Sequence, residues 1–258
     1  INYHLVGPEI AYIINDSESK AFITHERLAT EALRAAEEIA VPAEARFAIG
    51  SVPGFRPYAE LKAGQPTTAP DDRAAGTLII YTSGTTGKPK GVKRPLPPID
   101  PDTMAELGTA FHGFFDIRPF EDNVHLTVAP LYHTAVGQFT QNALHSGHKV
   151  VLMDKWTPEG TLERIQRYKV TTSHMVPTMF HRLLQLPEEQ RAQYDVSSLR
   201  TMIHSAAPCP VPTKQKMLDW WGPVIWEYYA ATEGGGTTAT PEDWLRKPGT
   251  VGNVWPGS

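Results

Sequence analysis

Hydroxyl, glycine and lysine side chains are concentrated in residues 82–91, which read Thr-Ser-Gly-Thr-Thr-Gly-Lys-Pro-Lys-Gly. Glycines let successive backbone N–H groups converge on an anion, while hydroxyls and lysines add donors and positive charge. This composition suits a polyphosphate. The segment is not a Walker A loop, because Pro89 stands where that pattern requires a second glycine. The candidate phosphate-contacting residues are Thr82, Ser83, Gly84, Thr85, Thr86, Gly87 and Lys90, with Lys88 beside them.

A carboxylate follows another apolar run, in residues 228–234, which read Tyr-Tyr-Ala-Ala-Thr-Glu-Gly. Glu233 could hold Mg²⁺, which takes oxygen ligands and shares them with phosphates. Thr232 could donate to an α-phosphate, and the ring of Tyr229 offers a flat face to a purine. A Thr-Glu pair alone is more common as a helix cap, and a lone Gly/Ser/Thr loop is more common as a flexible turn.

Two further segments combine small or polar residues with proline. Residues 205–208 read Ser-Ala-Ala-Pro, which would let a planar base lie against the backbone or would form a plain turn. Residues 130–135 read Pro-Leu-Tyr-His-Thr-Ala, and His133 could face a substrate, although a lone histidine is more often structural. His145 and His148 have no third ligand beside them, so we expect no zinc site there. A Gly-x-Ser-x-Gly nucleophile elbow does not occur in the sequence.

The amino-acid composition limits the class of protein to which the chain can belong. The chain has 258 residues, 41% of them hydrophobic, and its formal net charge of -4 gives no footprint for nucleic-acid binding. Cys209 is the only cysteine, so an intrachain disulfide is impossible and a reducing cytoplasm is the simplest setting. No apolar run approaches the roughly 20 residues of a transmembrane helix. Peripheral association with a membrane stays open.

Apolar periodicity supplies the elements that position these segments. Apolar runs that predict strands alternate with amphipathic stretches that predict helices, and this alternation is typical of an α/β fold with a mostly parallel, helix-covered sheet. In such sheets ligands bind beyond the carboxyl ends of strands. We expect strands at 20–24, 47–49, 78–81, 124–128, 149–153, 170–176, 199–203 and 224–228, and helices at 27–40, 136–144, 158–168 and 213–221, with a linker at 64–76.

The four segments together resemble a known family. Residues 81–91 are similar, residue for residue, to the phosphate-binding signature of the adenylate-forming superfamily, which includes acyl-CoA synthetases, aryl-CoA ligases, luciferases and peptide-synthetase adenylation domains. Residues 229–233 resemble its Tyr-Gly-x-Thr-Glu motif, with Ala230 where glycine is usual. Residues 205–208 resemble its Gly-Ala-Ala-Pro segment, with serine first, and residues 130–133 resemble its Pro-Leu-Phe-His motif.

The resemblance implies a fold, a reaction and site residues. The chain would be part of the large N-terminal domain, in which ATP, Mg²⁺ and a carboxylic acid give an acyl-adenylate that coenzyme A then consumes. The implied catalytic residues are Thr232, Glu233 and Lys90, with Glu233 on the metal. The implied nucleotide-binding residues are Thr82, Ser83, Gly84, Thr85, Thr86, Gly87, Lys90, Ser205, Ala206, Ala207, Pro208, Glu227, Tyr228, Tyr229, Ala230 and Thr232. The implied acyl-binding residues are His133 and Gly137.

The resemblance also divides the chain and narrows the substrate. Residues 1–66 would end a first subdomain and residues 67–258 would form the nucleotide- and acyl-binding core, without the small C-terminal domain and its adenylation lysine. We therefore expect no efficient turnover by these residues alone. No acidic residue lies in 130–139, which disfavours an α-amino acid as the substrate. The residues at 204–210, 220–223 and 227–230 are most similar to those of bacterial fatty-acyl-CoA ligases. An aryl-CoA ligase, a peptide-synthetase adenylation domain and a non-catalytic nucleotide-binding module remain alternatives.

Overall fold

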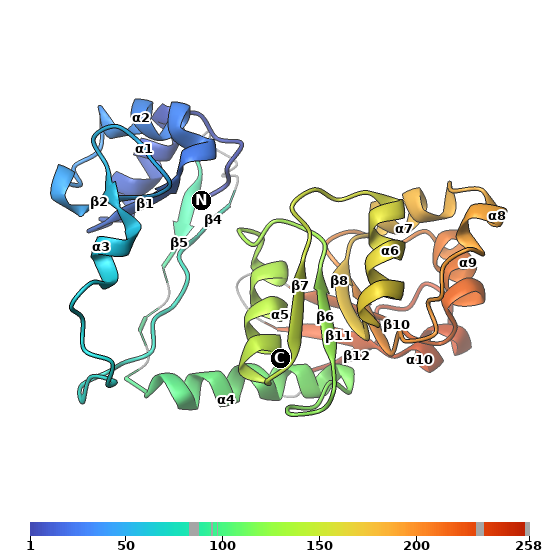
Figure 1. Cartoon of the computed structure of the whole chain (residues 1–258). Helices are drawn as coiled ribbons and strands as arrows, with labels where there is room; N and C mark the ends of the chain where they lie inside the picture. The colour runs from blue at the N-terminus through green and yellow to red at the C-terminus, as the bar shows by residue number, and fades with distance from the viewer. Residues whose placement is uncertain (83–87, 94, 97, 231–234, 256–258) are drawn as a thin grey trace. The chain divides into compact units, whose positions relative to one another are not determined.

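The computed structural model describes residues 1–82, 88–93, 95–96, 98–230 and 235–255 (Figure 1). The chain divides into two compact units, Ile1–Pro101 and Asp102–Ser258. The expected boundary after residue 66 concerns the subdomains of the family and stays a prediction. None of the helices within the described residues is both long enough and apolar enough to cross a membrane.

The first unit is built on a small parallel sheet and two packed helices. Strands β1 (Phe22–His25), β2 (Arg46–Ile49) and β3 (Arg56–Pro57) pair in that order, and helices α1 (Gly7–Asp16) and α2 (Ala29–Ala36) pack on each other. Gly7 lets these helices approach closely, because a Cβ there would collide with the side chain of Arg34. The short helices are η1 (Glu26–Leu28), η2 (Ala43–Ala45) and α3 (Tyr58–Lys62).

A β-hairpin completes the first unit. Strands β4 (Ile80–Thr82) and β5 (Lys90–Val92) are antiparallel, with Thr82 opposite Lys90. Helix α1 anchors the hairpin through two tyrosines: the Tyr81 hydroxyl donates to Asp16 at 2.6 Å, and the Tyr12 hydroxyl donates to the Pro89 carbonyl at 3.0 Å. Burial and the Asp16 hydrogen bond raise the pKa of Tyr81, so its hydroxyl stays protonated.

The second unit contains a seven-stranded sheet in the order β12-β11-β10-β9-β8-β6-β7. Its five strands from β10 to β7 are parallel, and β11 and β12 add on antiparallel. The expected α/β class with a mostly parallel sheet is confirmed. The strands are β6 (Val124–Thr127), β7 (Lys149–Leu152), β8 (Thr172–Met175), β9 (Thr201–His204), β10 (Ile225–Ala230), β11 (Gly236–Ala239) and β12 (Asn253–Val254).

Helices cover both faces of this sheet (Figure 1). The helices are α4 (Pro101–His112), η3 (Gly113–Phe115), α5 (Thr134–His145), α6 (Pro158–Tyr168), α7 (Pro177–Leu184), α8 (Glu188–Arg191), α9 (Val211–Trp221) and α10 (Pro241–Arg246). On one face α6, α7, α9 and α10 bury an aliphatic core in which Ile165 and Leu183 are fully covered. Burying one such side chain contributes about 1.5–3 kcal/mol. On the other face α4 and α5 cover an aromatic layer centred on Phe139.

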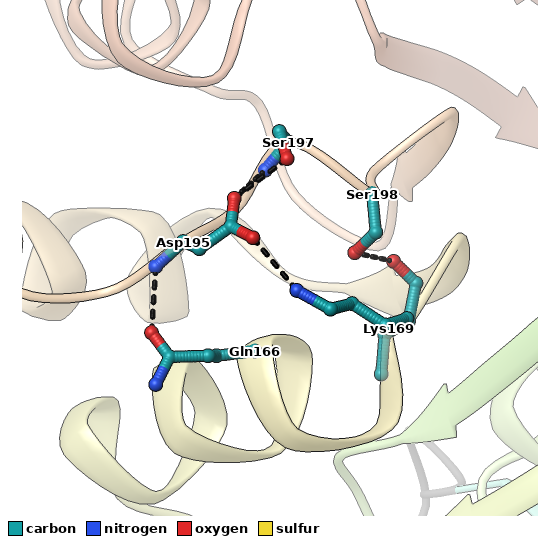
Figure 2. Close-up of polar contacts among 6 residues, drawn as sticks. Gln166, Lys169, Asp195, Ser197 and Ser198 are labelled. Atoms are coloured by element: carbon teal, nitrogen blue, oxygen red, sulfur yellow. Dashed lines mark hydrogen bonds and ion pairs between the residues drawn. The ribbon is translucent and has the colours of Figure 1, made fainter.

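Polar contacts fix the amino-terminal edge of the parallel sheet (Figure 2). Lys169 ends α6 in the left-handed region, and its Nζ lies 2.7 Å from Asp195 Oδ2. The Asp195 backbone N–H donates to Gln166 at 2.8 Å, and the Ser198 hydroxyl donates to the Val170 carbonyl at 2.8 Å. These bonds attach the end of α6 to the segment that enters β9. The Lys169–Asp195 pair is exposed, so solvent and salt screen it and it contributes little to stability.

Candidate functional site

Three of the candidate segments lie at one edge of the second unit's sheet. Strands β6, β9 and β10 are parallel, so their carboxyl ends meet at the same edge. Residues 130–133 follow β6, residues 205–208 follow β9, and residues 228–230 end β10. Because His204 pairs directly with Glu227, the segments after β9 and at the end of β10 are immediate neighbours.

Residues 205–208 divide between the core and the surface. Ser205 is buried, and its hydroxyl lies 2.8 Å from Nε2 of the buried His174. Ala206, Ala207 and Pro208 are exposed and thus open to a ligand. Ala206 has φ of +73°, a left-handed conformation that costs a non-glycine residue roughly 1–2 kcal/mol. Such strain is often found at functional sites.

Alternate residues of β10 point to opposite faces of the sheet. The Tyr228 ring belongs to the aromatic layer, 5.7 Å from Phe115 and 6.0 Å from Phe139. Burial raises its pKa, while a hydrogen bond with Ser205 opposes this. Tyr229 is 65% exposed, so its ring is available to a ligand, and Ala230 is exposed beside it.

Glu227 points into the aliphatic core and is engaged by two basic side chains. Its Oε2 accepts a hydrogen bond of 2.7 Å from Nζ of Lys214 and lies 3.3 Å from Nε2 of His204. Burial opposes ionisation of Glu227, but His204 and Lys214 outweigh it and lower the pKa of the carboxyl. Burial lowers the pKa of Lys214 and of His204, and Glu227 opposes both shifts. The carboxylate of Glu227 thus faces protein groups.

The Pro-Leu-Tyr-His segment forms a tight turn into α5. His133 is the N-cap residue of that helix and is exposed, with its ring 4.4 Å from the Tyr132 ring. A Cβ at Gly137 would lie 2.8 Å from the Leu131 carbonyl oxygen, so glycine lets the turn fold back onto the first turn of the helix. The contacts of Gly137 are those of packing, and its place in an acyl-pocket wall stays a prediction.

Histidines stack in the aromatic layer behind this edge. The Phe139 ring lies between those of His112 and His174, at 5.4 Å and 5.3 Å with interplanar angles of 16° and 17°. Burial lowers the pKa of both His112 and His174 to about 4, with smaller effects from neighbouring histidines. Burial likewise lowers the pKa of His125 to about 3. These rings are therefore neutral at physiological pH, and those of His112 and His174 stack on Phe139.

Two of the phosphate-contacting candidates, Thr82 and Lys90, lie on the paired strands β4 and β5 of the first unit. Lys90 is exposed at the start of β5, and Nζ of Lys88 lies 5.1 Å from the centre of the Tyr12 ring. Lys90 thus has the freer cation for a ligand. Seven predicted site residues lie outside the described residues, namely Ser83, Gly84, Thr85, Thr86, Gly87, Thr232 and Glu233. Their roles stay predictions.

Two groups at the site were not anticipated from sequence, Lys214 and His204. Helical spacing carries a signal for Lys214, because it lies on one stripe of α9 with the buried Met217, Leu218 and Trp221. In the part of the chain that the structure describes, no cluster of three or more histidine, cysteine, aspartate or glutamate side chains could hold a metal ion.

Comparison with known proteins gives a consistent result. The family described as "AMP-binding enzyme" matches residues 1–258. Long-chain-fatty-acid–CoA ligase of Bacillus subtilis (strain 168) is 33% identical over 186 residues, which are 70% of this chain and 31% of the relative. Indoleacetate–CoA ligase of Aromatoleum aromaticum is 27% identical over 266 residues, 99% of this chain and 49% of the relative. The chain thus spans between about a third and a half of these curated relatives.

Solved structures share the fold. ATP-bound MatB from Rhodopseudomonas palustris superposes with a TM-score of 0.74 at 27% identity, over 100% of this chain and 49% of that one. The amide bond synthetase McbA from Marinactinospora thermotolerans gives a TM-score of 0.80 at 24% identity, over 97% of this chain and 49% of that one. The second likeness bears on the fold alone.

Proposed function

The chain belongs to the AMP-binding enzyme family, and we propose that it is the nucleotide- and acyl-binding part of an AMP-forming acyl-CoA synthetase of the fatty-acid–CoA ligase branch. The observation that carries the proposal is the match of this family to residues 1–258. The convergence of residues 130–133, 205–208 and 228–230 at one sheet edge supports it, since that is where ligands bind in such sheets. Residues 1–66 are proposed as the end of a first subdomain and 67–258 as the core.

The proposed reaction has two steps. A carboxylate oxygen of the acid attacks the α-phosphorus of ATP, and the bond from that phosphorus to the oxygen that bridges it to the β-phosphorus breaks. Pyrophosphate is released and an acyl-adenylate forms. The thiol sulfur of coenzyme A then attacks the acyl carbon, AMP leaves with the ester oxygen, and the thiol proton passes to solvent. The first step requires no general base, because a carboxylic acid is already ionised at neutral pH.

Charge neutralisation is the main task of the protein in the first step, because an anion must approach a polyanion. Residues 82–87 and Lys90 are proposed to hold the β- and γ-phosphates, and Thr232 the α-phosphate. A donor aimed at developing charge in a dry site contributes about 3 kcal/mol. Glu233 is proposed to hold Mg²⁺, and one carboxylate together with phosphate oxygens is a donor set that suits this ion. When bound, Mg²⁺ supplies positive charge that neutralises the phosphates.

The adenine base is proposed to lie against the exposed residues 206–208 and the exposed ring of Tyr229. Ser205 and Glu227 have buried side chains with protein partners, so any contact that they make with the nucleotide would come from their backbone, whereas Tyr228 is half-buried against the aromatic layer. Ala230 is exposed at the end of the strand and can approach the ligand closely.

The acyl group is proposed to bind beside His133 and Gly137, at the start of α5. The lack of an acidic residue in 130–139 removes a partner for an α-amino group, and the long-chain-fatty-acid–CoA ligase relative favours a fatty acid. Coenzyme A is the proposed second substrate. A cytoplasmic setting, with or without peripheral contact to a membrane, accords with the single cysteine.

A second candidate is an aryl-CoA ligase. Relatives named indoleacetate–CoA ligase and feruloyl-CoA synthase, 27% and 29% identical, favour an aromatic acid. ATP–pyrophosphate exchange on the full-length protein, across fatty, aryl, sterol-derived and amino acids, separates the candidates. Exchange with fatty acids supports the proposal. Exchange only with aryl acids instead supports the second candidate, an aryl-CoA ligase. Exchange with none of them, by folded protein, refutes both and favours a non-catalytic nucleotide-binding module.

A further inference from the structure

Lys214 is a fully buried lysine, which is rare in a soluble protein unless the charge has a partner. It lies in the first half of α9, and its Nζ donates to Glu227 Oε2 at 2.7 Å. The same Nζ lies 5.2 Å from the centre of the Trp244 ring of α10. The cation is therefore held between one carboxylate and one aromatic face, beneath the sheet.

The carboxylate joins two strands as well as the helix. Glu227 lies in β10, and its Oε2 is 3.3 Å from Nε2 of His204, the last residue of β9. The His204 ring packs edge-on against Phe180 of α7, 5.5 Å away. The Glu227 Oε2 atom of β10 thus accepts a hydrogen bond from α9 and lies close to β9, where His204 Nε2 makes no hydrogen bond, and all three side chains are buried.

This buried cluster brackets the segments proposed to contact adenosine, so the inference rests on the proposed function. His204 directly precedes residues 205–208, and Lys214 lies in the helix that follows them. Glu227 directly precedes Tyr228 and the exposed Tyr229. His204 and Lys214, which flank residues 205–208 in the sequence, therefore both contact the carboxylate of Glu227. Glu227 in turn directly precedes residues 228–230.

Stability alone does not account for such a cluster. Taking two charges out of water costs several kcal/mol per ion, so a buried ion pair can often be replaced by apolar groups with no loss of stability. A directional contact with fixed geometry instead selects one relative placement of the groups it joins. At this position it holds a loop that contains a left-handed, non-glycine residue, Ala206.

We infer that Lys214 is a positioning residue for adenosine binding: with Glu227 and His204 it fixes the end of β9 against the end of β10, and so sets the spacing of the two segments that contact the base. Lys214 itself does not touch the nucleotide. Its loss should weaken ligands that carry adenosine and leave metal-free tripolyphosphate unaffected, because the residues proposed to hold the β- and γ-phosphates, 82–87 and Lys90, lie in another segment of the chain.

The test is calorimetric titration of the full chain with AMP, ATP and inorganic tripolyphosphate. Lys214→Met should weaken AMP and ATP about tenfold, as expected for a shift of well under 1 Å at a site, and should leave tripolyphosphate binding unchanged. Lys169→Met is the matched control, because it removes an exposed lysine from an ion pair at the opposite edge of the sheet; it should leave binding of all three ligands unchanged.

A second variant distinguishes an effect on positioning from an effect on stability, because Lys214→Met removes the hydrogen-bond donor of the buried Glu227 carboxylate. Lys214→Met with Glu227→Gln removes both charges, so its urea midpoint should return towards that of the wild type while AMP binding stays about tenfold weaker. AMP affinity that recovers with stability overturns the inference, as does equal weakening of tripolyphosphate. A folded wild-type protein that binds neither AMP nor ATP instead refutes the proposed function, and the inference with it.

Discussion

Acidification should unfold the second unit steeply, because His112, His125 and His174 are buried in neutral form and burial lowers the pKa of His204 as well. Burial is the main cause that lowers the pKa of His112 and His174 to about 4 and that of His125 to about 3. In the unfolded chain each histidine titrates near 6.5. Below that pH the unfolded state binds protons that the folded state does not. The stability contributed by these groups is therefore fully present above pH 6.5 and is lost as pH falls towards 4.

The expected size follows from these pKa values. One pKa unit corresponds to about 1.4 kcal/mol, so three histidines give a slope of about 4 kcal/mol per pH unit. Between pH 6.5 and pH 5 the loss is about 5 kcal/mol, because the unfolded histidines are already half protonated at pH 6.5. This loss is comparable with the total stability of a typical domain, about 5–15 kcal/mol. This window lies above the range in which most carboxylates titrate, so the histidine contribution can be observed separately.

Urea unfolding at closely spaced pH values from 8 to 5, followed by tryptophan fluorescence, measures this slope. His112→Phe is the informative variant, because neither ring nitrogen of His112 has a hydrogen-bond partner and its ring stacks on Phe139. Phenylalanine keeps the stacking and removes one titrating group, so the slope should fall by about a third. A wild-type stability that is flat between pH 6.5 and 5, or a slope unchanged by His112→Phe, would refute the reasoning.

Three further outcomes concern packing and backbone. Phe180→Ala should destabilise the second unit by about 3–5 kcal/mol in urea unfolding, since the ring is fully buried between α7 and the sheet; a loss below 1 kcal/mol would contradict the packing. Gly137→Ala should cost about 1–3 kcal/mol because the new Cβ would press on the Leu131 carbonyl, whereas a neutral effect would show that the turn can move. Ala206→Gly should raise stability by up to about 1 kcal/mol in the same assay by relieving the positive φ, and a decrease would contradict a left-handed Ala206.

Elements with strong local signals are confirmed by the structure. Helix α6 has the predicted bounds because Thr157 caps it, with its hydroxyl accepting from Gly160 N–H at 3.0 Å, and Pro158 starts it. The parallel strands β6, β8 and β9 form at the predicted ranges 124–128, 170–176 and 199–203, and they are buried on both faces although each contains polar residues.

Other elements differ from the expectation for physical reasons. Strand β7, predicted at 149–153 as an apolar strand, lies at an edge of the seven-stranded sheet, and Leu152 is 58% exposed. The expected helix over 27–40 is η1 followed by α2, which ends at Ala36. Strands β5 and β11 carry glycine and polar residues, and they form because a neighbouring strand pairs with them, which no local pattern reveals.

The candidate site was predictable as segments and less so as side chains. The sequence predicted that residues 205–208 and 228–230 lie at the ends of strands, and the structure shows that the two strands are neighbours. The sequence did not reveal that Glu227 points into the aliphatic core and Tyr228 into the aromatic layer. Which face each strand residue takes depends on the helices that cover the two faces of the sheet. Lys214 was missed because a lysine is normally assigned to the surface, although its helical position is that of a core residue.

The central proposal is that residues 82–87 and residues 232–233 bind the same ATP molecule. Calorimetric titration of the full chain with ATP and Mg²⁺ tests it most directly, with Thr85→Ala, Glu233→Ala and the double variant. The account predicts that each single variant weakens ATP binding at least tenfold, and that the double variant weakens it by less than the product of the two. Wild-type affinity for ATP in either single variant would contradict the claim.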